Sequence, residues 1–466
     1  MFGMFNLARL TSTPQADPGI CRAWWARAKA LCDRLRGAVF ASNQQEALAG
    51  AAEEAPSTPA ASVSGHRPGA APALTLLFLV CAQAALLQPY LVLLPGERTN
   101  LFTPLLALLP LIPLWRQCRS AWGRRHWAVW LLLGVGLAGC ARLSAEPASS
   151  LARVFAFWAP ASSGLFCGAV LLGQADSRRL FFRCLTTCFA AVTAMHFVLA
   201  SPPKFLGWHH HALTGVLLLL SAGPLHWLLS ASGWGRIAPA ALLAAGYALC
   251  FQAGSRFAVL LPILIFCGLA LSGRAGWLRS LALAALVAAL ALCFFAANPG
   301  KLLRFDNYES TSYRLEGVSA AFDLMRQHPL AGIGIRTSRV ELLQDFVPSF
   351  GTADRDFFLG VLARNVTLDN QYLSLPVGVG IPLAVLYFFL VGRLFLRFGR
   401  AAAAHRLDSA TDMALLVPLA GTVLHLAIYD GLFYPQVGWF FHLLLGLAAS
   451  LSPGDTPQAR GPIRDR

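Results

Sequence analysis

The chain has 466 residues, of which 56% are hydrophobic and only 13% are charged, and its mean hydropathy is +0.58. Because soluble domains carry about a quarter charged residues, this composition excludes a chain of ordinary soluble domains and indicates a protein embedded in lipid. The formal net charge is +15, but the arginines fall mainly in short gaps between apolar runs, a pattern typical of membrane topology and not of a nucleic-acid-binding surface.

The N-terminal segment, residues 1–72, differs in composition from the rest of the chain. Within it, one helical face carries apolar residues and the opposite face carries basic ones, which predicts a basic helix lying on a membrane surface. The apolar residues are Ile20, Trp24, Leu31, Leu35 and Val39, and the basic ones are Arg22, Lys29 and Arg36. An ordinary solvated helix is the alternative. The stretch 41–72 is rich in Ala, Ser, Pro and Glu and predicts a flexible linker. We therefore expect a tail made of a surface helix and a linker.

Twelve apolar runs follow, and each is a candidate transmembrane helix. They lie at 74–94, 101–115, 127–141, 151–173, 180–200, 213–230, 237–252, 257–272, 278–297, 373–396, 413–429 and 436–452. A spanning helix needs roughly 20 apolar residues, with about 17 tolerated, and several runs are near this lower limit, so ten or eleven spans remain an alternative. The expected fold is all-α: a polytopic membrane protein with about 12 transmembrane helices, nine within 73–297 and three within 373–452, followed by a tail at 453–466.

Positively charged loops decide the orientation of these helices. With twelve spans both termini lie on one side, together with the arginine-rich loops, which contain Arg116, Arg119, Arg124, Arg125, Arg178, Arg179, Arg183, Arg236, Arg274, Arg279, Arg393, Arg397, Arg400 and Arg406. The opposite short loops carry about one positive charge each. The positive-inside rule therefore predicts that both termini are cytoplasmic and that the long polar loop, residues 298–372, is periplasmic or extracellular.

The long loop is expected to contain helices of its own. Ser312 is placed to cap a helix that a proline at 329 would end. The apolar residues expected to share one face of this helix are Leu315, Val318, Phe322 and Met325. Gly332-Ile333-Gly334 then predicts a tight turn, and a second helical stretch at 354–364 leads to Asp369 at the mouth of the tenth span. Such amphipathic helices predict a lid packed against the membrane face.

The ionisable candidates for chemistry gather at the outer face. They are Arg256 in a turn between two spans, Arg314, His328 and Arg336 in the long loop, and Asp369 at the start of the tenth span. An arginine suits a phosphate because its planar fork forms bidentate bonds and keeps its charge. A carboxylate at a helix N-terminus is held ionised and can accept a proton. No span carries a charged residue well away from its ends, which argues against an ion-coupled transporter.

Each candidate also has a purely structural interpretation. Arg256 could anchor a helix end at the lipid interface, Asp369 with Asn370 could form only a helix N-cap, and His328 before a proline could simply end a helix. The run His209–His211 invites a metal site, but adjacent histidine side chains diverge. No Cys or Cys/His pair has zinc spacing either, so no metal is expected.

Four motifs follow one another in the second half of the chain. They are Gly254-Ser255-Arg256 at the start of a span, Ser312-Tyr313-Arg314 on a loop helix, His328-Pro329-Leu330-Ala331-Gly332-Ile333-Gly334, and Asp369-Asn370-Gln371-Tyr372-Leu373 at the start of the next span. In this order and topology the set resembles the O-antigen ligase and polymerase superfamily of bacterial membrane glycosyltransferases. The resemblance covers roughly Phe251–Phe398, and the remaining spans match only by hydropathy.

This resemblance implies a GT-C-like helical bundle in the bacterial inner membrane and a metal-independent, inverting glycosyltransferase without a cofactor. The donor would be a glycan on undecaprenyl pyrophosphate, and the acceptor would be a glycan or lipid-linked sugar hydroxyl at the periplasmic face. Carried onto this chain, Arg256 and Arg314 would hold the pyrophosphate and stabilise the leaving group, and Asp369 would take the acceptor proton.

The remaining candidates would bind or position the substrate. Asn370 and Tyr372 would hold the base and the acceptor in place, and His328 and Arg336 would contact substrate from the long loop. Nucleic acid is not an expected partner, whereas membrane lipids are.

Two departures from the ligase pattern bear on the reaction. Asp369 stands where ligases carry a histidine, and Gly378 stands where a glutamate is often found. These departures favour a polysaccharide polymerase, of the O-antigen or exopolysaccharide type, over a ligase that acts on lipid A-core, which is the alternative. A lipid-linked oligosaccharide flippase is a further alternative, although the chain lacks two similar halves. A non-catalytic assembly subunit is also left open.

Overall fold

The computed structural model describes residues 92–94, 97–100, 102–108, 123–144, 147–171, 175–198, 210–252, 308–335, 368, 370–403 and 409–451. They all belong to one compact unit, Pro68–Arg466, and the chain's other unit, Met1–Arg67, lies outside the described residues. The predicted surface helix Ile20–Val39 and its linker therefore stay predictions.

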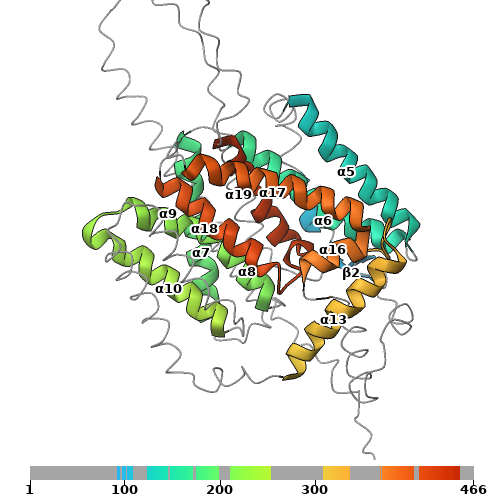
Figure 1. Ribbon diagram of the computed structural model, residues 1–466. Helices are drawn as coiled ribbons and strands as arrows, with labels where there is room; N and C mark the ends of the chain where they lie inside the picture. Colours follow the sequence, from blue (N-terminus) through green and yellow to red (C-terminus); the bar gives the residue numbers. More distant parts are fainter. Residues whose placement is uncertain are drawn as a thin grey trace, which may run out of the picture. The chain divides into compact units, whose positions relative to one another are not determined.

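The described part of the chain is helical, as predicted (Figure 1). Its elements, in chain order, are β1 (Val92–Leu94), β2 (Glu97–Asn100), α3 (Phe102–Leu108), α5 (Gly123–Leu143), α6 (Pro147–Leu171), α7 (Ala175–Val198), α8 (His210–Leu220), α9 (Ala222–Ser230), the 3-10 turn η3 (Gly233–Arg236), α10 (Ile237–Gln252), α13 (Tyr308–Gln327), α16 (Gln371–Val379), α17 (Ile381–Ala403), α18 (Ser409–His425), the 3-10 turn η6 (Gly431–Phe433) and α19 (Pro435–Leu451). One short antiparallel hairpin, in which β1 pairs with β2, departs from the helical pattern. Its first strand occupies the last three residues of the predicted first span, 74–94, so that span was predicted too long at this end, and a Pro-Gly pair at 95–96 favours a turn there.

Six of the predicted spans coincide with single helices, namely α5, α6, α7, α10, α18 and α19. Two others are divided: the run 213–230 at Ser221, between α8 and α9, and the run 373–396 at Gly380, between α16 and α17. The runs 257–272 and 278–297 lie outside the described residues. The total of twelve spans therefore stays a prediction.

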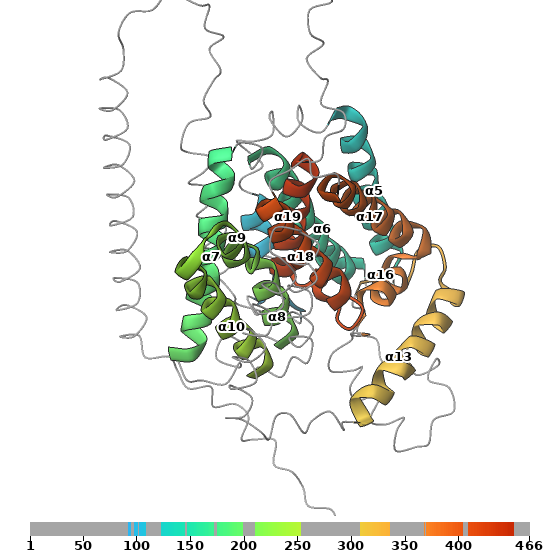
Figure 2. The same ribbon diagram turned by 60° about the vertical axis from the view of Figure 1, so that its left-hand side comes forward.

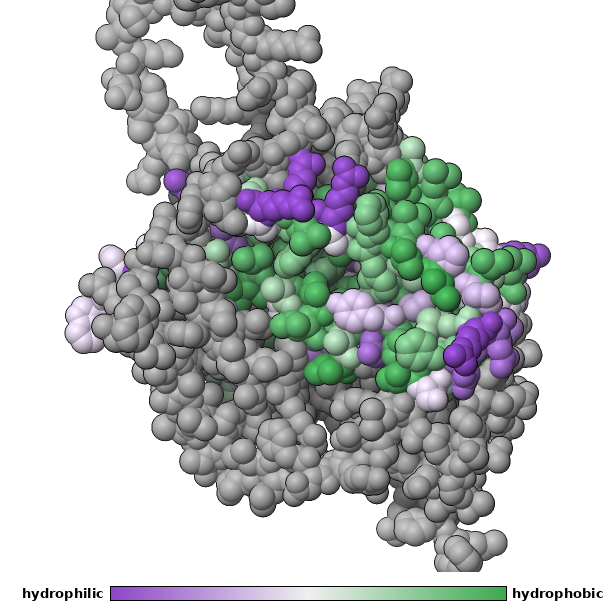
Figure 3. Space-filling model, viewed as in Figure 1, coloured by the Kyte–Doolittle hydropathy of each residue, from purple (hydrophilic) through white to green (hydrophobic). Residues whose placement is uncertain are grey.

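Within the described residues, two helical segments are long and apolar enough to cross a membrane by themselves. They are Ala212–Ser230, formed by α8 and α9, and Ile381–Ala402 in α17. Large apolar side chains on α5 and α17 point outward, such as Val135, which is 70% exposed, and Phe389, which is 60% exposed. Figure 3 shows apolar residues gathered on the surface of the described part of the chain. Such an outward apolar face is what lipid solvates in a membrane protein.

The core of the bundle is built where α6 packs along α19. Gly164 and Gly168 lie one turn apart on α6, and a Cβ at Gly168 would lie only 2.8 Å from the backbone nitrogen of Leu447. On the facing helix, a Cβ at Gly446 would lie 3.0 Å from the backbone nitrogen of Ala169. This GxxxG arrangement lets the two backbones touch, as small residues do between helices in membranes.

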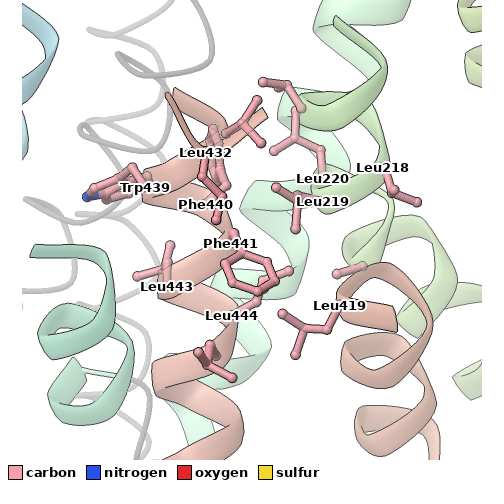
Figure 4. Packing of buried hydrophobic residues seen from close by; sticks show 14 of the residues in the cluster. Leu218, Leu219, Leu220, Leu419, Leu432, Trp439, Phe440, Phe441, Leu443 and Leu444 are labelled. Atoms are coloured by element: carbon pink, nitrogen blue, oxygen red, sulfur yellow. The ribbon is translucent and has the colours of Figure 1, made fainter. Parts of the chain in front are cut away.

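Large side chains fill the other side of α19. Phe441 and Leu444 of α19 pack together with Leu219 of α8 and Leu419 of α18, all of which are fully or almost fully buried (Figure 4). The contacts bring helices from the middle and the end of the sequence into one core. The same core carries α16 and α17, so it fixes the position of the segment that holds the candidate site.

A buried polar pair joins α17 to α19. The Nδ1 atom of His442 lies 2.7 Å from the carbonyl oxygen of Gly438, which can only accept a hydrogen bond, so Nδ1 carries the proton. The Nε2 atom therefore accepts from the Tyr387 hydroxyl at 3.0 Å. Both side chains are buried, and each polar atom has its partner, so the pair specifies how the two helices pack.

Candidate functional site

The candidate site is organised by a break in the predicted tenth span. The helix α16 is only nine residues long, and Gly380, with φ +84°, separates it from α17. The Gly380 N–H donates to the Pro376 carbonyl at 2.9 Å and ends the first half-helix. A Cβ at Gly380 would overlap the carbonyl oxygen of Leu330, so both the backbone angle and the close approach require glycine. Broken helices of this kind are where membrane proteins often form substrate sites.

The segment 328–334 docks onto this break. The Ile333 N–H donates to the Val377 carbonyl at 2.9 Å, the Gly334 N–H donates to the Gly378 carbonyl at 3.0 Å, and the Ile381 N–H donates to the Pro329 carbonyl at 2.8 Å. The glycines of this motif therefore have a backbone role, since Gly332 and Gly334 both adopt positive φ.

This docking explains one departure from the ligase pattern. A Cβ at Gly378 would lie 3.2 Å from the Ile335 Cα and 3.3 Å from its Cγ1. The glutamate that the resemblance would place there has no room unless the segment at Ile335 moves. Arg153 of α6 also holds this segment: its guanidinium donates a hydrogen bond to the Ile335 carbonyl at 3.1 Å. Sequence reasoning did not select Arg153, although an arginine within an apolar run is a signal that could have found it.

The N-cap of α16 is Asn370. Its side-chain Oδ1 accepts from the Tyr372 N–H at 3.0 Å, and its carbonyl accepts from the Ser374 N–H at 2.8 Å. The structural alternative was that Asp369 and Asn370 together form only an N-cap. Asn370 alone fills the N-cap position. Asp369 itself lies outside the described residues, so its role as a base stays a prediction.

The end of α18 meets the beginning of α16. The Gln371 N–H donates to the Leu426 carbonyl at 2.8 Å, just beyond the last turn of α18. The Tyr372 hydroxyl donates to the Val423 carbonyl at 2.7 Å, so this hydroxyl ties the two helices together. The negative end of the α18 dipole thus faces the positive end of the α16 dipole, and the two partly offset each other.

The loop helix α13 lies beside α16 in both views (Figures 1 and 2). It ends at Gln327 before the predicted proline, but it begins at Tyr308, four residues before the predicted cap. Its buried face agrees with the predicted one only in part: Met325 is buried as predicted, but Ala321 and Leu324 are buried as well, and Phe322 is 54% exposed. The small residues on the buried face allow α13 to pack closely, and hydropathy alone did not select them.

The mouth of α16 lies near the middle of α13. A Cβ at Gly317 would lie 3.8 Å from the Leu368 Cδ2 atom, and Leu368 directly precedes Asp369. Arg314 lies three residues, about one helical turn, before Gly317 on α13. The structure thus brings the Arg314 stretch of α13 and the Asp369–Tyr372 motif to the same region. The Arg314 side chain, Arg256 and Arg336 lie outside the described atoms.

The structure separates His328 from the mouth of α16. His328 is exposed and follows the last residue of α13, and the next residue pairs with Ile381 beyond the other end of α16. Nine helical residues with a rise of 1.5 Å place roughly 13 Å between the two ends of α16. His328 is therefore a helix terminator in the structure, and its contact with substrate stays a prediction.

In the part of the chain that the structure describes, no three His, Cys, Asp or Glu side chains are grouped so that they could hold a metal ion. Residues His209 and His211 lie outside the described side chains. The prediction that no metal takes part is therefore tested by experiment below.

Comparison with known proteins identifies the segment that contains this site. Residues 239–388 match the family model described as O-antigen ligase. No curated protein matches the chain. The matched segment contains Arg256, Arg314 and the motif that opens α16, so the resemblance found in the sequence is confirmed over these residues. Residues 239–388 therefore match the O-antigen ligase family, and the resemblance to the O-antigen ligase and polymerase superfamily rests on this part of the chain.

Proposed function

We propose that the chain transfers a glycan from undecaprenyl pyrophosphate to an acceptor sugar hydroxyl at the periplasmic face, and that repeated transfer polymerises a polysaccharide. The observation that carries this proposal is the mouth of α16, where Asn370 fills the capping position. A capped helix does not need a second capping carboxylate, so Asp369 is available for a chemical role.

The proposed step is a direct displacement. The acceptor oxygen forms a bond to the anomeric carbon of the donor while the bond from that carbon to the pyrophosphate oxygen breaks. The acceptor proton passes to Asp369, and the electron pair leaves with undecaprenyl pyrophosphate. Attack opposite the leaving group inverts the anomeric carbon. No cofactor is required, because no atom is oxidised or reduced.

Arginine side chains are the proposed phosphate ligands because the backbone at the mouth of α16 is already occupied. The Gln371 N–H bonds to Leu426 and the Tyr372 N–H bonds to Asn370. These two N–H groups of the first turn are thus not free to bind an anion. Arg256 and Arg314 would supply bidentate bonds and positive charge to the leaving pyrophosphate without a metal. The packing of α13 beside Leu368 supports this role for Arg314.

Polymerisation is preferred over ligation for two reasons. An aspartate stands in place of the histidine expected in ligases, and Gly378 packs so closely on Ile335 that the expected glutamate would require Ile335 to shift. Ligation to lipid A-core is the second candidate, because the matching family is described as O-antigen ligase.

One assay tests these candidates together. The purified full-length chain, reconstituted in sealed lipid vesicles, receives lipid-linked glycan extracted from cells that carry the gene, with or without lipid A-core. Longer lipid-linked glycans without lipid A-core support the polymerase. Transfer only to lipid A-core supports the ligase, and translocation of an unchanged glycan would support a flippase and refute glycan transfer.

A further inference from the structure

The break in the tenth span leaves two backbone carbonyls without their helical donors. In a continuous helix the Val377 carbonyl would accept from the Ile381 N–H, but that N–H donates to the Pro329 carbonyl at 2.8 Å instead. The Gly378 carbonyl has no helical donor either, because the residue four positions on is Pro382, which lacks an N–H. Val377 and Gly378 are both buried, so each carbonyl needs a donor from elsewhere in the chain.

Residues 333–335, the docked segment, supply these donors. The first N–H of the segment donates to the Val377 carbonyl at 2.9 Å, and the second donates to the Gly378 carbonyl at 3.0 Å. The segment thus completes the hydrogen bonding of a helix that cannot complete it alone. Its last residue, Ile335, is 1% exposed and belongs to the hydrophobic core. Buried backbone contacts therefore determine where the docked segment lies.

Arg153 holds the last residue of the docked segment. It is the only charged residue of α6, and its guanidinium donates to the Ile335 carbonyl at 3.1 Å across 182 positions of sequence. A charge in an apolar helix is costly and is kept where polar groups receive it. The helix α6 is itself fixed, since Gly164 and Gly168 pack it against the backbone of α19. Arg153 therefore joins the docked segment to the core of the bundle.

We propose that Arg153 is a positioning residue for glycan transfer, which rests on the proposed function. It holds the docked segment on the broken span, and this segment follows α13, the helix that contains Arg314. When the docked segment leaves the break, α13 loses its backbone attachment to α16 and α17. Arg153 acts through the docked segment and touches no reacting atom.

The first test is Arg153→Met in the purified full-length chain, which removes the donor and keeps an unbranched side chain. Hydrogen exchange measures the docking directly, because the N–H groups of Ile333 and Gly334 are protected by their bonds to α16. We expect roughly 10–100-fold faster exchange of these two N–H groups, the factor that corresponds to one hydrogen bond from a charged donor. Exchange within α19 should not change. Unchanged exchange in the docked segment would overturn the inference.

Glycan transfer should fall together with this protection. For Arg153→Met we expect kcat/KM per folded molecule to be about tenfold lower, because a small displacement far from the reacting atoms is enough to slow transfer. A role in folding alone would lower the melting temperature or the membrane level and would leave transfer per folded molecule unchanged. That result would overturn the inference.

The matched control is Arg142→Met, which removes the same charge from the neighbouring helix. Arg142 lies in the last turn of α5, and its side chain is exposed. The predicted topology puts both arginines near the outer ends of their helices. We expect wild-type exchange and wild-type transfer in this variant. Equal losses in the two variants would attribute the effect to positive charge at the outer face and would overturn the inference.

The substitution Arg153→Lys separates positioning from direct binding of phosphate, and it also serves if Arg153→Met does not fold. A carbonyl needs a single N–H donor, which a lysine supplies, whereas a phosphate ligand would lose its bidentate fork. We expect protection and transfer to be kept together or lost together. Lost transfer with full protection would show that Arg153 binds substrate and would overturn the inference. A wild type that transfers no glycan refutes the proposed function and this role together, whereas an active wild type with an unaffected Arg153→Met refutes only the role of Arg153.

Discussion

The substitution Asp369→Asn separates chemistry from stability most sharply. If Asp369 is the general base, its removal should lower kcat by about 10²–10⁴-fold, because the amide cannot accept the acceptor proton. The structure also determines the expected effect of this substitution on stability. Since Asn370 caps α16 through its bond to the Tyr372 N–H at 3.0 Å, Asp369→Asn removes no cap, and we expect the free energy of unfolding to change by less than about 0.5 kcal/mol.

The comparison variant is Asn370→Ala, which does remove the cap. Loss of an N-cap side chain costs about 0.5–2 kcal/mol, so this variant should melt at a lower temperature than Asp369→Asn. Thermal unfolding in detergent measures the stability of each variant, and single-turnover transfer from the lipid-linked donor measures its rate of glycan transfer. Asp369→His should recover part of the activity, since ligases carry a histidine at this position.

Two results would refute this reasoning. Wild-type turnover of Asp369→Asn would remove the carboxylate from the mechanism. A large fall in stability of Asp369→Asn, with Asn370→Ala unaffected, would show that the cap had been assigned to the wrong residue.

Three substitutions and one chelator experiment test the packing and the site. Gly168→Ala places a methyl group against the backbone of α19 and should lower the free energy of unfolding by about 1–3 kcal/mol, measured by thermal unfolding. The control Gly392→Ala, whose Cβ meets nothing within 4 Å, should be neutral. Equal melting temperatures of the two variants would contradict the close packing. Tyr387→Phe leaves the buried His442 Nε2 without its donor and should cost about 1 kcal/mol, measured in the same way, with no change in transfer per folded molecule. Arg314→Lys keeps the charge but loses the bidentate fork, so transfer should fall strongly at normal membrane levels. A chelator should leave transfer intact, and strict dependence on a divalent metal would count against the proposed mechanism.

The sequence predicts the helices well because hydrophobic periodicity is a local property. Six of the twelve apolar runs coincide with single helices to within five residues, and the helix before Pro329 ends where expected. The breaks within runs were not predicted, since they depend on tertiary contacts. At Gly380 the backbone adopts φ +84°, and Leu330, which is distant in sequence, occupies the space where a Cβ would lie.

Only part of the candidate site could be predicted from the sequence, because its contacts join residues that are far apart along the chain. Residues with a motif, such as Asn370 and Tyr372, could be selected, but their partners could not. The contacts of Tyr372 with Val423 and of Gln371 with Leu432 connect residues that lie 51 and 61 positions apart. No local pattern reports such pairs. The GxxxG on α6 was readable in the sequence, whereas its partner Gly446 is identified only by the packing.

The docking of 329–334 on the broken span gives α13 the mechanics of a lever. Three backbone hydrogen bonds attach the segment after the C-terminal end of α13 to α16 and α17, and this attachment point is the fulcrum. The 14 residues from Arg314 to His328 extend roughly 21 Å from it. A rotation of about 10° around the fulcrum would move the backbone at Arg314 by about 4 Å, which is close to the reach of one side chain. Small changes in angle at Pro329 and Ile381 would thus be magnified at the arginine.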